Sequence, residues 1–179
     1  MARFQVPQVA GGLYHLTQRG VRREAIFLDD LDRRDLLLLL GAVALRHRWQ
    51  CLAWCLMENH FHLCVRTPEP NLARGMQFLC GLYAQRFNRR HGRVGCLFQG
   101  RYGGFTVEDE VHALEALRYV VLNPVRAGIV ATPEEWPWSS HRVVAGLVPA
   151  PRWLAVEEVL APFDGSVEEY RRFVQAGIA

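Results

Sequence analysis

Apolar and polar positions follow strand and helix periods along most of the chain and predict an ordered series of elements. The runs that we expect to form strands are 13–19, 50–57, 60–66 and a short one around 96–98. Apolar residues at helical spacing predict helices over 31–48, 72–90 and 107–122. We expect the last helix to stop before Asn123-Pro124, because proline disfavours helical geometry in the residue before it.

The order of these elements, β-α-β-β-α-β with a further helix, is typical of the ferredoxin-like fold. This α+β, RRM-like architecture has an antiparallel sheet with its helices on one face. We expect one such domain over residues 1–145 and a C-terminal extension over 146–179 that packs on the domain or trails it. In the extension, Ser166 and Glu169 form a capping-box pattern that predicts the start of one short amphipathic helix.

The composition is that of an ordinary globular protein. Half of the 179 residues are hydrophobic, and the longest apolar run, 36–45, is too short to cross a bilayer. The first residues lack the pattern of a secretion signal, so we expect a cytoplasmic protein with no membrane partner. Five cysteines without a repeated spacing make a disulfide framework an unsuitable interpretation.

The charge distribution is more informative than the net charge of +3. Residues 71–107 contain no Asp or Glu, and their six arginines alternate with aromatic residues. A solvated helix face is one interpretation of this stretch. Nucleic-acid binding is the stronger one, because arginine binds phosphate and aromatic rings stack on bases. A second basic segment, residues 19–23, is expected to form a loop. The candidate DNA-binding residues are Arg19, Arg22, Arg23, Arg86, Arg89, Arg90, Arg93, Arg101, Tyr102 and Arg126.

The sharpest local pattern is His60-Phe61-His62. Side chains alternate along a strand, so the two imidazoles face one side and Phe61 faces the other. Two neutral imidazoles one strand-step apart can share a divalent metal. Two polar residues on a half-exposed strand would give the same pattern, and a zinc site with nearby cysteines would lack a second Cys-x-x-Cys pair.

A second pattern places Tyr119 four residues before Asn123, on the same face of a helix. A tyrosine beside a metal-polarised phosphate can attack phosphorus as a nucleophile. A packing role would also explain a single tyrosine. On chemistry alone, Tyr14, Tyr83 and Tyr102 compete for the nucleophile's role, although Tyr83 lies on the apolar stripe of its helix.

Six segments with these residues occur in a characteristic order over most of the chain. They are Tyr14–Gly20, Met57–Leu63, Phe87–Arg93, Leu97–Tyr102, Tyr119–Gly128 and Trp136–Ser140. Together they resemble the HUH single-tyrosine (IS200-like) transposases, and most closely the REP-associated tyrosine transposase branch.

The resemblance implies a ferredoxin-like fold with a late helix that bears the catalytic tyrosine, Tyr119. It also implies a divalent cation, Mg²⁺ or Mn²⁺, on His60 and His62. Asn123 stands where the wider family often has a glutamine as third ligand. The implied substrate is single-stranded or hairpin DNA, such as a REP-like palindrome. We expect either a monomer or a homodimer, and the sequence does not decide between them.

Two other functions are compatible with the sequence. One is a non-catalytic, RRM-like nucleic-acid-binding module, although no RNP-type aromatic pair is present. The other is a metal-dependent nuclease in which water attacks the phosphate. A covalent protein–DNA adduct would separate the transposase chemistry from both alternatives.

Overall fold

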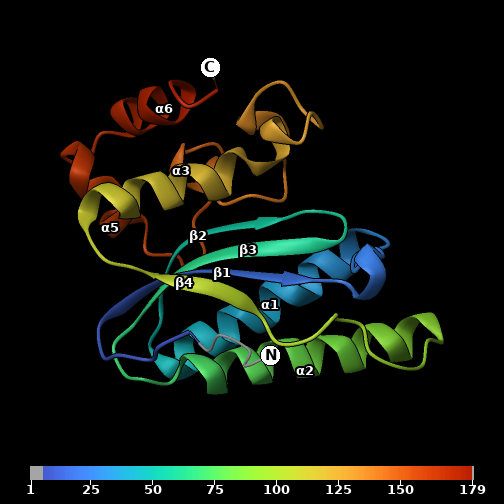
Figure 1. Cartoon of the computed structure of the whole chain (residues 1–179). Helices are drawn as coiled ribbons and strands as arrows, with labels where there is room; N and C mark the ends of the chain where they lie inside the picture. Colours follow the sequence, from blue (N-terminus) through green and yellow to red (C-terminus); the bar gives the residue numbers. More distant parts are fainter. Residues whose placement is uncertain (1–5, 179) are drawn as a thin grey trace.

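A four-stranded antiparallel sheet forms the centre of the computed structural model, which describes residues 6–178 (Figure 1). The strands are β1 (Gly12–Arg19), β2 (Gln50–Leu56), β3 (His60–Thr67) and β4 (Gly103–Val107), in the order β2-β3-β1-β4. The longer helices are α1 (Asp30–His47), α2 (Leu72–His91) and α3 (Glu110–Arg126). The shorter ones are η1 (Val21–Arg23), η2 (Pro133–Glu135), α4 (His141–Val144), α5 (Val156–Leu160), η3 (Ala161–Phe163) and α6 (Val167–Gln175). This order and topology confirm the predicted ferredoxin-like fold.

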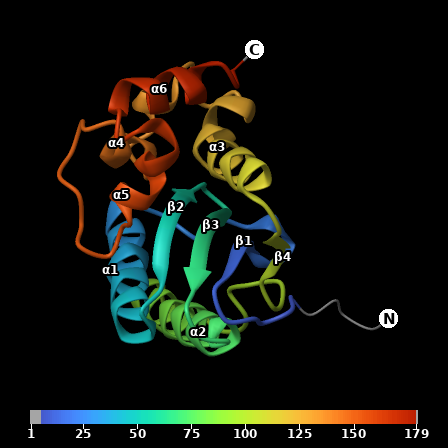
Figure 2. The ribbon, with the colours of Figure 1, turned by 90° about the vertical axis from the view of Figure 1, so that its left-hand side faces the viewer.

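Helices cover both faces of the sheet. α1 and α2 lie against one face, and α3 with the C-terminal helices lies over the other (Figure 2). Side chains that alternate toward α1 and α2, such as Leu16, Phe61 and Leu63, are fully buried. Side chains that alternate toward α3 are more polar, as the strand pattern of His60 and His62 predicts.

Two predicted boundaries are wrong. The fourth strand lies at β4 and not around residues 96–98, where Phe98 forms only an isolated bridge with Gly20. β4 begins with two glycines, which have low strand propensity, and its position is set by pairing with β1. α3 starts at Glu110, capped by the side chain of Asp109, and continues through Pro124 to Arg126. Only a few residues follow the proline, so one missing helical hydrogen bond does not end the helix.

The C-terminal segment belongs to the same packed structure. Ser139 and Leu154 form bridges to the outer strand, β2, and so cover an edge that would otherwise be open. α6 begins as expected at Ser166, whose side chain accepts a hydrogen bond from the Glu169 amide. Within residues 146–178, α5 and η3 are present in addition to the helix that the sequence predicted.

α6 packs on α3 through a cation–π contact. The guanidinium carbon of Arg118 lies 4.6 Å from the centroid of the Phe173 ring. Gly177, just after α6, approaches the same arginine so closely that an added Cβ would lie 2.7 Å from its Cδ. The extension therefore contacts the helix that bears the candidate nucleophile.

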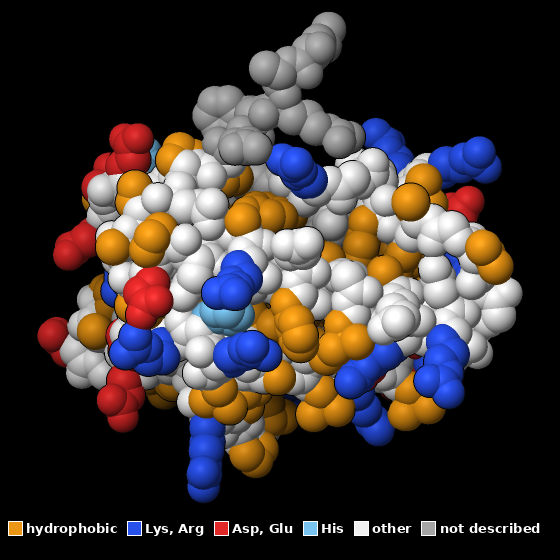
Figure 3. All heavy atoms as spheres, turned by 90° about the horizontal axis from the view of Figure 1, so that it is seen from below, with side chains coloured by type: hydrophobic (Ala, Val, Ile, Leu, Met, Phe, Trp, Pro, Cys, Tyr) orange, Lys and Arg blue, Asp and Glu red, His pale blue; other side chains and the backbone are white. Residues whose placement is uncertain are grey.

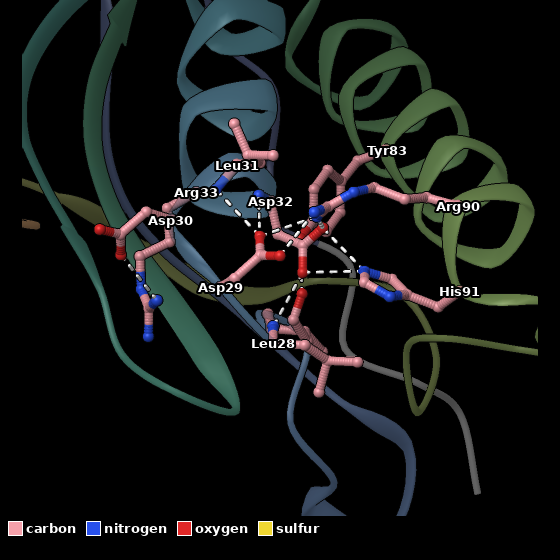
Figure 4. Close-up of polar contacts among 10 residues, drawn as sticks. Leu28, Asp29, Asp30, Leu31, Asp32, Arg33, Tyr83, Arg90 and His91 are labelled. Carbon is pink, nitrogen blue, oxygen red and sulfur yellow. Dashed lines mark hydrogen bonds and ion pairs between the residues drawn. The ribbon is translucent and has the colours of Figure 1, made fainter.

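A cluster of charged side chains joins the start of α1 to the end of α2 (Figure 4). Its centre is Asp32, which is 2% exposed. The Asp32 carboxylate accepts hydrogen bonds from the Leu28 amide at 2.8 Å, from Arg90, and from Nε2 of His91 at 2.9 Å. Arg90 also pairs with Asp29, which caps α1. A buried carboxylate is tolerated because each of its partners is a hydrogen-bond donor.

The arginines of the acid-free stretch do not form a continuous basic surface. Figure 3 shows arginine side chains spread over the face below α2, with hydrophobic patches between them and most acidic side chains near one edge. Arg86 pairs with Asp35 of α1 at 2.6 Å, and Arg90 pairs with Asp32 of α1 and with its N-cap, Asp29. A stretch of sequence without acidic residues can therefore still lie beside acidic residues from other parts of the fold.

We expect Asp32→Ala to lower the free energy of unfolding by about 1–3 kcal/mol, because it leaves partly buried donors without their acceptor. The control is Asp30→Ala, which removes an exposed carboxylate 3.5 Å from Arg33 and should cost less than about 1 kcal/mol. Urea unfolding of both variants measures the difference. Equal losses would show that the cluster does not join the two helices.

Candidate active site

Polar side chains from the two central strands gather under α3. β1 contributes His15 and Thr17, and β3 contributes His60 and His62. In the antiparallel register, Thr17 lies opposite His62 and Arg19 lies opposite His60. Side chains of opposite residues point to the same face, so the pairing of the strands assembles one polar cluster.

Both ring nitrogens of His62 have polar neighbours. Its Nδ1 lies 3.1 Å from Nε2 of His15 and 3.0 Å from Oγ1 of Thr17, and its Nε2 lies 3.2 Å from Nδ2 of Asn123. His15 also stacks on it, with the ring centroids 5.2 Å apart. Burial lowers the pKa of His62 to about 3 and that of His15 to about 4. Both imidazoles are therefore neutral at neutral pH, which is the form that binds metal ions.

His60 is oriented by its neighbour in the β2–β3 turn. Nδ1 of His60 lies 2.7 Å from Oδ1 of Asn59, an atom that can only accept, so Nδ1 carries the proton and Nε2 keeps its lone pair. The other end of the amide donates to the Arg23 carbonyl at 3.0 Å. Arg22 and Arg23 both have positive φ angles, 53° and 61°. Burial, and then the charge of Arg19, lower the pKa of His60.

α3 brings Tyr119 and Asn123 to the histidines. The Tyr119 ring lies 5.7 Å from that of His62 and 5.5 Å from that of His15, edge to face in both cases. Its other neighbour is Arg126, whose guanidinium carbon lies 5.2 Å from the ring centroid. The ring is 40% exposed, so a substrate can reach it. The four-residue spacing thus places both side chains at one site, as the sequence predicted.

The donor set of the site consists of two imidazoles and one amide. Within residues 6–178, no three His, Cys, Asp or Glu side chains come together as a metal-binding group. The three cysteines nearest along the chain, Cys51, Cys55 and Cys64, are fully buried. Burial raises the pKa of each of these thiols, so without a metal they stay protonated.

The competing tyrosines lie elsewhere in the fold. Tyr83 is buried between the sheet and α2, where its hydroxyl donates to the Ile26 carbonyl. Burial raises its pKa well above the ordinary value. Tyr14 is fully buried, and Tyr102 is half-buried against the core. Among the candidates that the sequence offered, only Tyr119 contacts the histidine cluster in the described part of the chain.

The candidate DNA-binding arginines fall into three groups. Arg19 and Arg126 border the site, and Arg22 and Arg23 form η1 beside it. Arg86, Arg90 and Arg93 have acidic partners, in the case of Arg93 the Glu24 carboxylate at 3.9 Å. The ion pairs formed within residues 6–178 do not include Arg89 or Arg101.

Sequence reasoning missed three members of the site. His15 and Thr17 hold His62, and Asn59 holds His60. His15 and Thr17 alternate along β1 as the two histidines do along β3, which was a usable signal. It becomes specific only when β1 and β3 are known to be neighbours in this register.

Comparison with known proteins identifies the family. The model of the family described as "Transposase IS200 like" matches residues 8–123, a range that includes both histidines, Tyr119 and Asn123. The chain belongs to this family of transposases. A protein of Haemophilus influenzae, whose name assigns it to the REP-associated tyrosine transposases, is 24% identical over 172 residues. The alignment covers 86% of this chain and 93% of that protein, which confirms the resemblance to the REP-associated branch.

Solved structures support the same fold. A REP-associated tyrosine transposase bound to a REP hairpin has a TM-score of 0.68 at 22% identity, covering 83% of this chain and 89% of the other. The tRNA(His) guanylyltransferase of Saccharomyces cerevisiae has a TM-score of 0.50 at 7% identity, covering 98% and 82%. Two such different activities show that the fold alone does not decide the chemistry. No helix within residues 6–178 is long and apolar enough to span a membrane.

We expect tetranitromethane to nitrate Tyr119 before Tyr83. The reagent attacks accessible phenolates, and Tyr83 is 1% exposed with a raised pKa. Peptide mass spectrometry after brief treatment identifies the modified residue, and Tyr119→Phe is the control that should remove the earliest product. Early modification of Tyr83 would contradict the described packing of α2.

Proposed function

We propose that this transposase cuts and rejoins single-stranded DNA with Tyr119 as nucleophile, beside a divalent cation held by His60 and His62. The observation that carries the proposal is that α3 sets Tyr119 and Asn123 against the histidines within a single chain. A nucleophile and metal-binding groups on adjoining rigid elements supply the positioning on which phosphoryl transfer depends.

The residues of the site fit a hard divalent cation. His60 and His62 are neutral, and each has its Nδ1 engaged by another side chain, so Nε2 is the nitrogen that would bind the cation. For His62 this requires a turn of the Asn123 amide, whose nitrogen lies 3.2 Å from Nε2. Asn123 presents its amide nitrogen toward His62, and half a turn of the amide would present the oxygen in its place. Bound there, Mg²⁺ or Mn²⁺ would polarise a non-bridging phosphate oxygen and neutralise part of its charge.

The proposed reaction is transesterification at phosphorus. The Tyr119 hydroxyl oxygen bonds to phosphorus while the bond from phosphorus to the 3′ oxygen breaks. The phenol loses its proton and the departing oxygen gains one, which yields a 5′-phosphotyrosine and a free 3′-OH. Attack by a 3′-OH on the phosphotyrosine reverses these changes and rejoins the strand without ATP.

The arginines around the site would hold the DNA backbone. Arg19 lies near His60 and Arg126 lies against Tyr119, and both would bind phosphates next to the scissile one; Arg22 and Arg23 would extend this basic surface. The related structure contains a REP hairpin, which supports a hairpin with single-stranded arms as the substrate. Arg90 is engaged by aspartates, and we assign it a smaller share of the binding than the sequence suggested.

The two alternatives leave parts of this geometry without a function. A purely binding module makes no use of two oriented, neutral imidazoles beside a tyrosine. A nuclease that uses water makes no use of the Tyr119 hydroxyl. A covalent adduct between protein and DNA is expected only from the transposase reaction.

Tyr119→Phe should abolish the covalent adduct and leave folding and hairpin binding near normal, because it removes only a hydroxyl at a partly exposed position. The assay incubates labelled hairpin DNA with Mn²⁺ and detects the adduct on a denaturing gel. Tyr83→Phe is the matched control. It loses one buried hydrogen bond, worth about 1 kcal/mol, but should still form the adduct. An adduct that persists in Tyr119→Phe would refute the assignment.

Removal of the cation or of its ligands should stop cleavage but preserve DNA binding, because phosphate contacts supply most of the affinity. We expect EDTA, His60→Ala and His62→Ala to lower the cleavage rate at least about 100-fold. Titration of Mn²⁺ by electron paramagnetic resonance should show weaker binding in both variants and, to a smaller extent, in Asn123→Ala. The control is His112→Ala, at the exposed start of α3, which should behave as the natural protein. Undiminished Mn²⁺ binding in the double His60→Ala, His62→Ala variant would place the cation elsewhere.

A further inference from the structure

An exposed aromatic ring lies next to the site without a role in the proposed reaction. Phe105 of β4 is 53% exposed and pairs across the sheet with His15. Opposite residues of neighbouring strands point to the same face, so Phe105 stands on the face that carries the histidines. Two residues further along, Val107 has the same orientation but is buried. Phe105 is thus the point at which this face of β4 emerges into solvent.

The Phe105 ring packs against His15, which also contacts the candidate nucleophile. The centroids of the His15 and Phe105 rings are 5.1 Å apart, edge to face. His15 in turn contacts Tyr119, with ring centroids 5.5 Å apart. In residues 6–178, the exposed aromatic side chains are Phe78, Phe105 and Tyr119. Two of these three therefore flank one histidine, whereas Phe78 lies on α2 across the sheet.

The surface beside Phe105 is open. Gly103 lies two residues earlier on the same face, pairs with Thr17 and is exposed. A Cβ at Gly103 would meet nothing closer than the Thr17 carbonyl oxygen at 4.0 Å. Because Gly103 has no side chain, the space next to the Phe105 ring is open. A planar group has room to lie flat against the ring there.

We propose that Phe105 is a stacking platform for one nucleobase of the single strand, close to the phosphate that Tyr119 attacks. Base–aromatic stacking suits this position because every base has a π-face and an exposed phenyl ring has no hydrogen-bonding demand. Phe105 and Tyr119 both contact His15, so a base on Phe105 would lie one side chain away from the nucleophile. The inference rests on the proposed function for the identity of the ligand, and it adds a residue that fixes which nucleotide the strand presents.

The experiment measures binding of a DNA stem-loop with an oligothymidine arm on each side, using the full chain with Tyr119→Phe so that no strand is cut. A single abasic site is walked along the arms, and each DNA is tested with and without Phe105→Ala. We expect Phe105→Ala to weaken binding of intact DNA by about tenfold. At one position, the abasic site should cause a similar loss with Phe105 present and almost none with Phe105→Ala.

Matched variants separate stacking from a change in folding. Phe105→Trp should restore affinity and Phe105→Leu should not, while Phe78→Ala, which removes an exposed aromatic far from the site, should have no effect. Affinity within about twofold of the parent in Phe105→Ala would overturn the proposal. The proposal would also be overturned if the loss from Phe105→Ala and the loss from the abasic site added together at every position. Failure of the Tyr119→Phe chain to bind this DNA would overturn it as well. Cleavage is measured separately, through the covalent adduct on Tyr119. If the abasic-site experiment locates a stacked base but no adduct forms, the proposed function is refuted and the stacking proposal is not.

Discussion

The pairing of β1 with β3 is the constraint on which the candidate site depends. The register sets Thr17 opposite His62 and Arg19 opposite His60, and it brings His15 within hydrogen-bond distance of His62. A slip of one residue would turn the side chains of β1 to the opposite face. Tyr14 and Leu16, which are fully buried, would then face the site. Burial of these apolar residues on the α1 and α2 side therefore maintains the arrangement of the polar cluster on the other side.

The second half of the site depends on how α3 is held. Its buried residues, such as Val120 and Val121, pack on the sheet, and α6 packs on its outer side through the Arg118–Phe173 contact. A helix fixed from both sides presents Tyr119 and Asn123 at defined positions, one turn apart. Positioning of this kind contributes to catalysis because it removes the entropic cost of bringing the reacting groups together. The C-terminal extension is thus part of the support of the site.

Charge shows how strongly tertiary contacts modify a sequence pattern. An acid-free stretch predicted a basic surface, yet two aspartates of α1 and its N-cap aspartate bind two of the arginines of α2. Arginines outside that stretch, Arg19 and Arg126, are the ones that border the histidines and the tyrosine. Ion pairs form between elements far apart in the sequence, so net charge within a window does not measure the charge of a face.

The sequence by itself determined the order of elements, the shared face of His60 and His62, and the shared helix face of Tyr119 and Asn123. These properties follow from local periods of about two and 3.6 residues. The tertiary structure decided the rest. The position of β4 follows from pairing with β1, because its glycines carry little propensity of their own. α3 passes through Pro124 because packing outweighs one lost hydrogen bond. The contacts of His15, Thr17 and Asn59 with the two histidines, and the place of Phe105 beside them, required a strand register that only the folded chain establishes.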